Sequence, residues 1–541
     1  MEDSHHSHKC VRASLAIILI ASLASNLSVV IKDFGLSQSS DTYSYRFQVD
    51  SNGSTLVTIT YTSSEQSGSS WIIVPKFIEF TNRTLRGRIL DFSLSSTTDK
   101  LTTDYYFYNV LDFSFASDNQ FEMIIQYNFT TAAMIIEPYG IFLSPQIGYQ
   151  SNGVGEAEVT FPSNFEVQNA VTEGGYPPSF KEANYVRFDD LPTNILRLEI
   201  DFKIDGDQPS PLKIERGIFA FETSERYESY ALNILNLFNR TYDDLVDIFN
   251  TTLENINIEF FIPDFEAIYS IGGYVPFTGE TIGNIHINIF YTRYVEGYIE
   301  VTALHELVHH FLWRAGISPE DLLWFHEGMA QYVSIEISED IGLEGASMIK
   351  QEIESAAGRL SAINDLGFLV RWTPTSRPTD WGTLYIASYY VVSRLAEPYG
   401  ELDYYANLFK LLEAIEVDDN DELAYYLSLA SNRTVMPTLR SWGFDVVDLY
   451  TYSTLIMGVE RSIQDVSSYY QPYKFLAEQL YRWALDNARQ DRVDAANRLL
   501  LAAVMIAKLS PLLTLVTISG TLYGAILYAL KRKGLFSDQP L

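Results

Sequence analysis

The sequence predicts a multidomain α+β protein with an N-terminal antiparallel β-domain, a central α+β domain, an α-helical C-terminal part and a C-terminal transmembrane helix. Three observations predict this architecture. Alternating runs rich in Thr, Tyr, Phe and Val fill residues 32–203, apolar residues recur at helical spacing from Glu225 onward, and Leu509–Leu530 carries no charge. The 541 residues, 47% of them hydrophobic, are enough for two or more folded domains.

The first 31 residues have the pattern of an export signal. Lys9 and Arg12 precede an uncharged apolar run from 13 to 31, and small residues such as Ala24 offer a cleavage site for signal peptidase. We therefore expect residues 1–31 to form a signal peptide or a signal anchor.

Residues 32–205 have the pattern of antiparallel strands. Short runs that alternate between apolar and polar side chains, such as 54–62, 121–129 and 195–204, are separated by Ser, Asn, Gly and Asp. Alternation with period two and frequent turn residues is typical of sheets with one buried face. We expect a β-sandwich or a similar sheet domain that ends at the polar, proline-containing stretch 205–211.

The second domain, predicted at 206–345, combines helices and strands. Apolar residues recur at helical spacing in 225–249. The segment 298–314 contains neither proline nor glycine and is followed by Ala315-Gly316, which predicts one helix. Runs at 257–262 and 284–290 between these helices have the pattern of strands. The order helix, strand, strand, helix indicates an α+β domain.

The chain is predominantly helical from 346 to 495 and ends in a segment suited to a membrane. Leu509–Leu530 is uncharged and, as a helix, long enough for the roughly 30 Å hydrocarbon core. Lys531, Arg532 and Lys533 follow it, and the positive-inside rule keeps such residues in the cytoplasm. We expect 509–530 to be a transmembrane helix and the body to be extracellular. A buried core helix is the alternative.

Composition limits the partners and the compartment. The formal net charge of −32 at pH 7 argues against nucleic acid, whose phosphates require a basic surface. The single cysteine, Cys10, lies in the signal region, so the exported body can form no internal disulfide. We therefore expect a prokaryotic surface protein, with an archaeal source as one option. Sequons for N-glycosylation occur at Asn52, Asn82, Asn128, Asn239, Asn250 and Asn432.

The segment His305-Glu306-Leu307-Val308-His309 carries the main chemical signal. Residues four apart on a helix project from the same face, so the two imidazoles can reach one metal ion. Zinc accepts imidazole nitrogen at about 2.0–2.1 Å, and its catalytic sites keep one position open for water. A surface helix with two solvated histidines is the alternative, and the apolar flanks of this segment argue against it.

A carboxylate from a second helix completes the predicted site. The stretch Ser318–Asp321 is a helix start, with a capping hydroxyl, a proline and acids in the first turn. A short turn should pack this helix beside the first, so we predict one zinc ion bound by His305, His309 and Glu327. Glu306 can then take a proton from the water that zinc activates, which is metal-assisted hydrolysis.

Other third ligands fit the sequence less well. A metzincin would have glycine at 312 and histidine at 315, where this chain has Leu312 and Ala315, so that class is excluded. His310 points away from the pair on the helix, and His326 stands directly before the acid. We expect both histidines to pack or to support the ligands rather than to bind the metal.

These motifs resemble those of the gluzincin metallopeptidases, and within them the aminopeptidase N-like group, also called the peptidase MA-like family. Residues 322–333 are similar to that group's second-helix motif, which is an apolar pair, an Asn or similar residue, and then Glu-Gly-Phe-Ala-x-Tyr. One departure is that 17 residues separate His309 from Glu327, one fewer than that group generally has. The resemblance spans about 214–400 and implies a thermolysin-like α+β zinc peptidase fold for the second domain.

The resemblance also covers the segment that begins Tyr385-Ile386-Ala387-Ser388. In that family the leading tyrosine of the comparable helix hydrogen-bonds the oxyanion of the tetrahedral intermediate, which implies this role for Tyr385. The adjacent Tyr389 and Tyr390 are the alternatives. Because Tyr385 lies beyond 345, the resemblance implies that 346–495 forms the helical part of the catalytic region.

A third element of the resemblance concerns the substrate. The aminopeptidases of this family hold the free amino terminus of the substrate with the glutamate of a Gly-x-Met-Glu-Asn segment. In this chain the comparable region is 277–281, and only Glu280 matches in register. An amine-anchoring role for Glu280 is therefore one reading, and an exposed turn glutamate is the other.

Together these expectations describe a membrane-anchored, extracellular zinc metallopeptidase that acts on peptide or protein substrates. An aminopeptidase is slightly preferred over an endopeptidase of the same type. The competing hypothesis from another class is a catalytically inactive surface binding or adhesion protein that retains the fold. The intact Glu306 argues against it, because a protein without catalysis does not need a general base.

Overall fold

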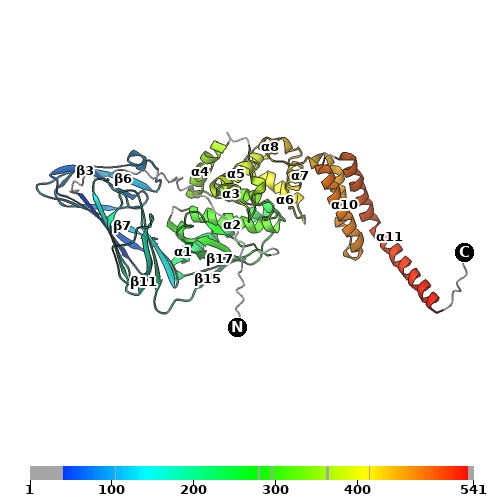
Figure 1. Ribbon diagram of the computed structural model, residues 1–541, viewed down its shortest axis with the longest axis horizontal. Helices are drawn as coiled ribbons and strands as arrows, with labels where there is room; N and C mark the ends of the chain where they lie inside the picture. The colour runs from blue at the N-terminus through cyan, green and yellow to red at the C-terminus, as the bar shows by residue number, and fades with distance from the viewer. Residues whose placement is uncertain are drawn as a thin grey trace. The chain divides into compact units, whose positions relative to one another are not determined.

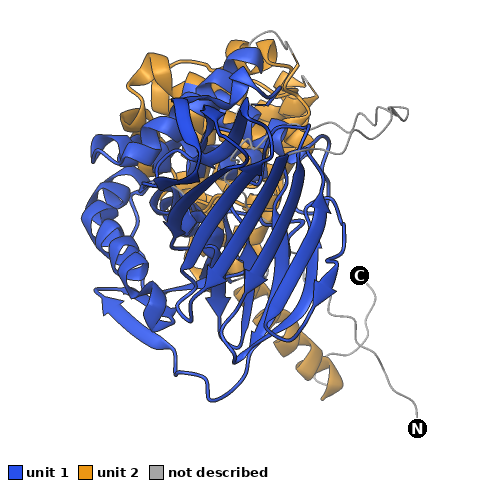
Figure 2. Cartoon of the chain, turned by 90° about the vertical axis from the view of Figure 1, so that its left-hand side faces the viewer, with its two compact units in different colours: residues 1–314, 323–361, 372–393 blue, residues 315–322, 362–371, 394–541 orange. Residues whose placement is uncertain are grey.

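The computed structural model describes residues 41–103, 105–277, 281–293, 296–360, 365–413, 415–490 and 492–533. The predicted signal segment 1–31, Cys10 included, lies outside the described residues. Internal contacts divide the chain into two compact units (Figure 2). The first unit contains the described residues of 1–314, 323–361 and 372–393, and the second contains those of 315–322, 362–371 and 394–541.

The N-terminal part of the first unit is rich in strands, as the period-two pattern predicts. The predicted run 121–129 is β7 (Phe121–Phe129), and the run 54–62 corresponds to β2 (Thr55–Ser63). Every second side chain of both strands is buried. The rings of Tyr61 and Phe113 meet edge to face with centroids 5.0 Å apart, which joins two sheets in one aromatic core.

Three sheets make up this β-rich region, coloured blue to cyan in Figure 1. A seven-stranded sheet contains, in spatial order, β12 (Phe180–Lys181), β13 (Tyr185–Leu191), β10 (Val154–Thr160), β1 (Asp41–Val49), β2, β7 and β4 (Thr81–Arg86). A three-stranded sheet contains β3 (Ser67–Pro75), β6 (Tyr108–Ala116) and β5 (Arg88–Ser96). A four-stranded sheet contains β11 (Phe165–Thr172), β14 (Leu198–Ile204), β9 (Tyr139–Leu143) and β8 (Ala133–Ile136).

A mixed five-stranded sheet follows in the same unit. Its spatial order is β15 (Leu212–Arg216), β16 (Phe219–Thr223), β17 (Ile256–Phe261), β19 (Ile285–Asn288) and β18 (Gly273–Tyr274). The three central strands β16, β17 and β19 are parallel, whereas β15 and β18 pair antiparallel at the two edges. The short strand β18 therefore forms one edge of this sheet.

Two helices of this unit pack against the sheet and each other. Helix α1 (Glu228–Phe249) fills most of the predicted 225–249 and ends at Asn250, which adopts the left-handed conformation with φ 50°. Helix α2 (Tyr298–Arg314) has the bounds that the sequence predicts. At its start the backbone N–H of Gly297 donates to Glu300 Oε2 at 2.8 Å, which satisfies one of the otherwise unpaired donors of a helix terminus.

The next helix begins later than the sequence predicts. Helix α3 (Leu323–Asp340) does not include the predicted start at 318–321. There the Ser318 hydroxyl accepts the N–H of Asp321 at 3.3 Å and donates to its carboxylate at 2.9 Å. The capping hydroxyl thus closes a separate turn, because a favourable cap stabilises one turn without deciding where the longer helix begins. Helices α4 (Glu344–Leu360) and α5 (Trp381–Ala396) follow.

The second unit is helical, in agreement with the predicted helical C-terminal part. Its helices beyond α5 are α6 (Leu402–Leu411), α7 (Asn420–Ser431), α8 (Met436–Ser441), α9 (Ser453–Gln464), α10 (Gln471–Arg489) and α11 (Val493–Arg532). Helix α11, drawn in orange to red in Figure 1, includes the predicted span 509–530. Among the residues that the structure describes, it is the one helix long and apolar enough to cross a membrane.

Candidate metal centre

Helix α2 presents two histidines on one buried face. His305 and His309 are four residues apart, so their side chains leave the helix on the same side, and their ring centroids lie 4.8 Å apart. Neither side chain is exposed to solvent. The helix continues through this point because no proline or glycine interrupts it, and leucine, valine and phenylalanine side chains bury it.

Helix α3 brings a carboxylate to the same point. Glu327 Oε2 lies 3.3 Å from His305 Nε2 and 3.7 Å from His309 Nε2. One ligand atom from each of the three residues lies within 4.8 Å of the others, an arrangement that could hold a metal ion. The 17-residue connection between His309 and Glu327 therefore lets Glu327 reach both imidazoles.

The polar atoms of this cluster fit a bound cation. Among the described residues, no hydrogen-bond partner exists for Nε2 of His305, Nε2 of His309 or Oε2 of Glu327. A buried polar atom without a partner costs on the order of 1–3 kcal/mol. A metal ion between the three side chains would supply a ligand interaction to each of these atoms, and two nitrogens with one carboxylate form a three-residue zinc set.

Burial also affects the protonation states in this cluster. It lowers the pKa of His305 to about 3, and it lowers the pKa of His309 well below 6.5, with help from the neighbouring histidines. Both imidazoles are therefore neutral near pH 7, which is the form that binds metals. Burial raises the pKa of the Glu327 carboxyl, and the charge of Glu306 raises it further. Burial also raises the pKa of the Glu306 carboxyl.

His326 supports one of the two imidazoles. Its Nδ1 lies 2.6 Å from Nδ1 of His309, and the two rings are nearly parallel, with an angle of 8° between them. One of the two nitrogens must carry the proton of this hydrogen bond. If His309 donates it, His309 Nε2 is left with a free lone pair directed at Glu327 and the metal position. The structure thus gives His326 a hydrogen bond to one of the two candidate ligand histidines.

We expect a His326→Ala variant to bind metal about 10–100-fold more weakly, because the loss of such a supporting hydrogen bond typically costs this much affinity. The measurement is competition with a chromophoric chelator for Zn²⁺. His310→Ala is the matched control, because His310 is also a buried histidine, with its Nε2 outside the hydrogen-bonded pair. Equal weakening in both variants would contradict a specific role for His326.

Glu306 lies against the edge strand β18. Its side chain is fully buried, and neither carboxylate oxygen has a hydrogen-bond partner among the described residues. A Cβ atom added to Gly273 of β18 would lie 2.6 Å from Glu306 Oε1 and 2.8 Å from its Cγ. The strand can approach Glu306 this closely only because residue 273 has no side chain. Sequence analysis did not single out Gly273, although the pair Gly272-Gly273 is a signal of close backbone approach.

Helix α5 packs against α3 next to Glu327. A Cβ atom on Gly328 would lie 2.6 Å from the backbone oxygen of Ser388 and 2.7 Å from Val392, so the two helices are in close contact at this glycine. Tyr385 lies three residues before Ser388 and seven before Val392, which places it on the same stripe of α5. Its ring is buried and meets Trp372 edge to face, with centroids 5.2 Å apart.

The two alternative tyrosines of α5 differ from Tyr385 in their surroundings. The Tyr389 ring lies 6.3 Å from that of Tyr332 on α3. Burial raises the pKa of Tyr389, and the charges of Glu354 and Glu336 add to the effect. Tyr389 thus faces acids of α3 and α4, whereas Tyr390 is only half-buried. The remaining predicted site residue, Glu280, lies outside the described residues.

A second group of acids lies in the second unit. Asp418, Asp419 and Glu422 could also hold an ion by their spacing. Asp419 accepts the backbone N–H of Glu422 at 2.8 Å and caps α7, and the Arg489 guanidinium donates to it. Because Arg489 already supplies a positive charge beside the carboxylates, this group forms an internal ion-pair network.

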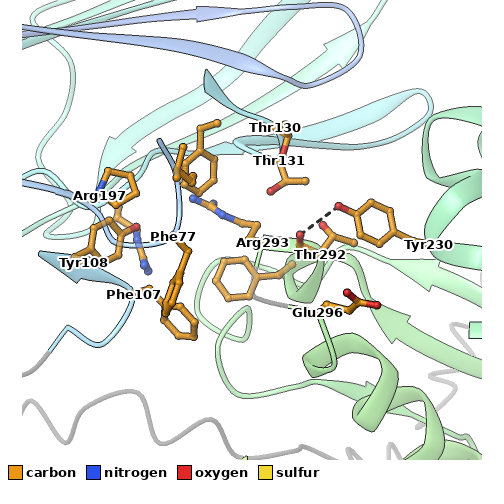
Figure 3. A pocket seen from close by; sticks show the side chains of 14 residues that line it. Phe77, Phe107, Tyr108, Thr130, Thr131, Arg197, Tyr230, Thr292, Arg293 and Glu296 are labelled. Carbon is orange, nitrogen blue, oxygen red and sulfur yellow. Dashed lines mark hydrogen bonds between the residues drawn. The ribbon is translucent and has the colours of Figure 1, made fainter. Parts of the chain in front are cut away.

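The first unit also contains a cavity of about 370 Å³ at the start of α2 (Figure 3). Aromatic side chains such as Phe77 and Phe107 line it together with Arg197 and Arg293. The Arg293 guanidinium lies 4.7 Å from the ring centroid of Phe129 and donates to the carbonyl oxygen of Leu143 at 2.8 Å. Arg293 therefore ties the β-rich region to the five-stranded-sheet region.

No protein-family model matches the chain, and no curated protein shows significant sequence similarity to it. The metal centre is therefore supported by its geometry. His305, His309, Glu306 and Glu327 are all buried, and all carry polar atoms that lack a hydrogen-bond partner among the described residues.

Proposed function

We propose that the protein is a membrane-anchored, extracellular zinc metallopeptidase of the gluzincin type, with a thermolysin-like metal-binding domain. The observation that supports this most strongly is the buried cluster of His305, His309 and Glu327, with ligand atoms within 4.8 Å of one another. Zinc is the proposed metal because imidazole nitrogen suits it, whereas magnesium and calcium prefer oxygen ligands. Bound there, zinc supplies a Lewis acid that activates water.

Glu306 is the proposed general base. It follows the first ligand on α2, and its carboxylate has no competing hydrogen-bond partner among the described residues. It takes the proton of the attacking water at a carboxylate oxygen and returns it to the nitrogen of the leaving amine. Tyr385 is the proposed donor to the oxyanion, because a phenol donates a hydrogen bond without adding a negative charge.

The membrane anchor in this proposal is α11. The helix is long and apolar enough to span a bilayer. It ends with Lys531 and Arg532, which would stay in the cytoplasm and so leave the metal centre outside the cell. The proposed substrates are therefore extracellular peptides or proteins.

A Gly273→Ala substitution is expected to slow hydrolysis by about 10²-fold while metal is retained, because a shift near 1 Å in a catalytic group can cost this much. The added Cβ would meet Glu306 Oε1 at 2.6 Å and must displace that carboxylate. Gly358→Ala is the control, since an added Cβ meets nothing within 4 Å there. Measured kcat should fall only in the first variant, and equal values in both would argue against a base at Glu306.

The function is tested with the purified full-length protein in detergent micelles. We expect about one zinc ion per chain after chelator-free preparation, and hydrolysis that a chelator abolishes and added zinc restores. A panel of peptides with free and blocked amino termini separates the two specificities. Preference for free termini supports the slightly favoured aminopeptidase, and equal cleavage of both supports the endopeptidase. A preparation without zinc or hydrolysis would contradict the proposal.

A further inference from the structure

Helices α10 and α11 form a hairpin, and the N-terminal end of α10, far from the connecting turn, lies beside the apolar span. The two helices run antiparallel, since only a short connection separates Arg489 from Val493. Near the other end of α10, the Tyr473 hydroxyl donates to the backbone oxygen of Leu513 at 3.2 Å and also bonds to the Thr517 hydroxyl. The first turn of α10 is therefore at the level of residues 513–517.

Residues 513–517 lie within the predicted span 509–530 and not before its first residue. The last charged residue before the span is Lys508, and Leu513 lies five residues beyond it, or about 7 Å along the helix axis. The axes of packed helices lie about 8–10 Å apart. A helix tilt near 20° therefore changes the depth of a residue on α10, relative to its neighbour on α11, by only about 3 Å. If α11 spans a bilayer, the first turn of α10 must therefore lie at the depth of the membrane surface.

The composition of the tip suits that depth. Between 467 and 477 the only charged side chain is Lys474. Tyr469 is 88% exposed and Phe475 57% exposed, and Leu476 is also exposed. Such exposed rings are unfavourable in water, whereas tyrosine is enriched at membrane interfaces and lysine can extend its ammonium group to the headgroups.

We infer that residues 467–477, the N-terminal tip of α10, insert into the boundary between headgroups and acyl chains of the leaflet that faces the body of the protein. The inference depends on the membrane anchor in the proposed function. The ligand is the phospholipid surface itself: Tyr469 and Phe475 enter the boundary, and Lys474 meets the phosphates. The tip and the span together attach the second unit at two places, which restricts rotation of the hairpin about the span.

The test uses the full-length protein with Cys10→Ser, reconstituted in phosphatidylcholine–phosphatidylglycerol vesicles and spin-labelled at single cysteines. The labels replace Tyr469, Phe475 or, as the matched control, Trp483, which is 53% exposed on α10 and lies farther from the tip. We expect collisions with an aqueous nickel chelate to be about threefold or more rarer at 469 and 475 than at 483, because the acyl boundary excludes the chelate.

A label at Leu522 in α11 separates this inference from the anchor on which it depends. If the label at 522 is shielded from the chelate while those at 469 and 475 are as accessible as at 483, the anchor holds and the inference is wrong. If the label at 522 is itself accessible, the anchor proposal fails. Shielding at 469 that disappears when the protein is diluted in more lipid would indicate a second copy of the chain, and would also overturn the inference.

Discussion

Replacement of Glu306 by glutamine is expected to slow peptide hydrolysis by about 10²–10⁴-fold while about one zinc ion per chain remains bound. Glutamine has the size of glutamate but cannot take a proton from water. The substitution removes no ligand, because His305, His309 and Glu327 supply the ligand atoms. The measurement is kcat for a peptide substrate, together with metal analysis of the same sample.

Glu300→Gln is the matched control for this variant. Glu300 is a second buried glutamate of α2, and burial raises the pKa of its carboxyl too. Its side chain accepts the N–H of Gly297 at 2.8 Å, and the amide oxygen of glutamine can still accept that bond. The control should keep kcat within a few-fold. Full activity in the Glu306→Gln protein would exclude Glu306 as the general base and would mean that another group takes the proton.

The second large effect is expected for the carboxylate ligand. Loss of a residue that supports a ligand typically weakens metal binding by about 10–100-fold. A Glu327→Gln variant should weaken it by more than this, because the substitution removes the only anionic ligand of the three. In the unsubstituted protein, zinc at about 1,000 times its Kd should stabilise the fold by about 4 kcal/mol. A chelator should therefore lower the melting temperature of the unsubstituted protein and leave that of the variant unchanged.

Glu336→Gln serves as the control on the same helix. Glu336 pairs with Lys350 at 2.9 Å, at the opposite end of α3 from the metal cluster, and it is partly exposed. This variant should keep the zinc content and the chelator-dependent shift in melting temperature. If Glu327→Gln shows the same zinc content and the same shift as Glu336→Gln, the third ligand has been assigned wrongly.

The helix that carries the histidines illustrates what can be predicted from sequence. The bounds of α2 follow from local chemistry, since a segment without proline or glycine ends before Ala315-Gly316. The start of α3 does not follow in the same way. A good capping stretch at 318–321 closes its own turn, and the helix begins at Leu323. Element type depends on pattern, whereas terminal residues depend on packing.

The approach of β18 to Glu306 illustrates what sequence cannot predict. Gly273 and Glu306 are far apart in the chain, and no periodic pattern relates a two-residue edge strand to a helix. The contact exists because β18 pairs with β19, and α2 packs against both strands. The same holds for Gly328, which admits the backbone of α5 beside Glu327.

The kinds of element, the residues able to bind a metal and the apolar span can be predicted from sequence, because they depend on local spacing and composition. The approach of Glu327 to both histidines and the pairing of His326 with His309 are visible only in the folded chain. The same is true of the contact between the first turn of α10 and the span. These contacts join segments distant in sequence, and they form because burial of the helix and strand faces between them brings those segments together.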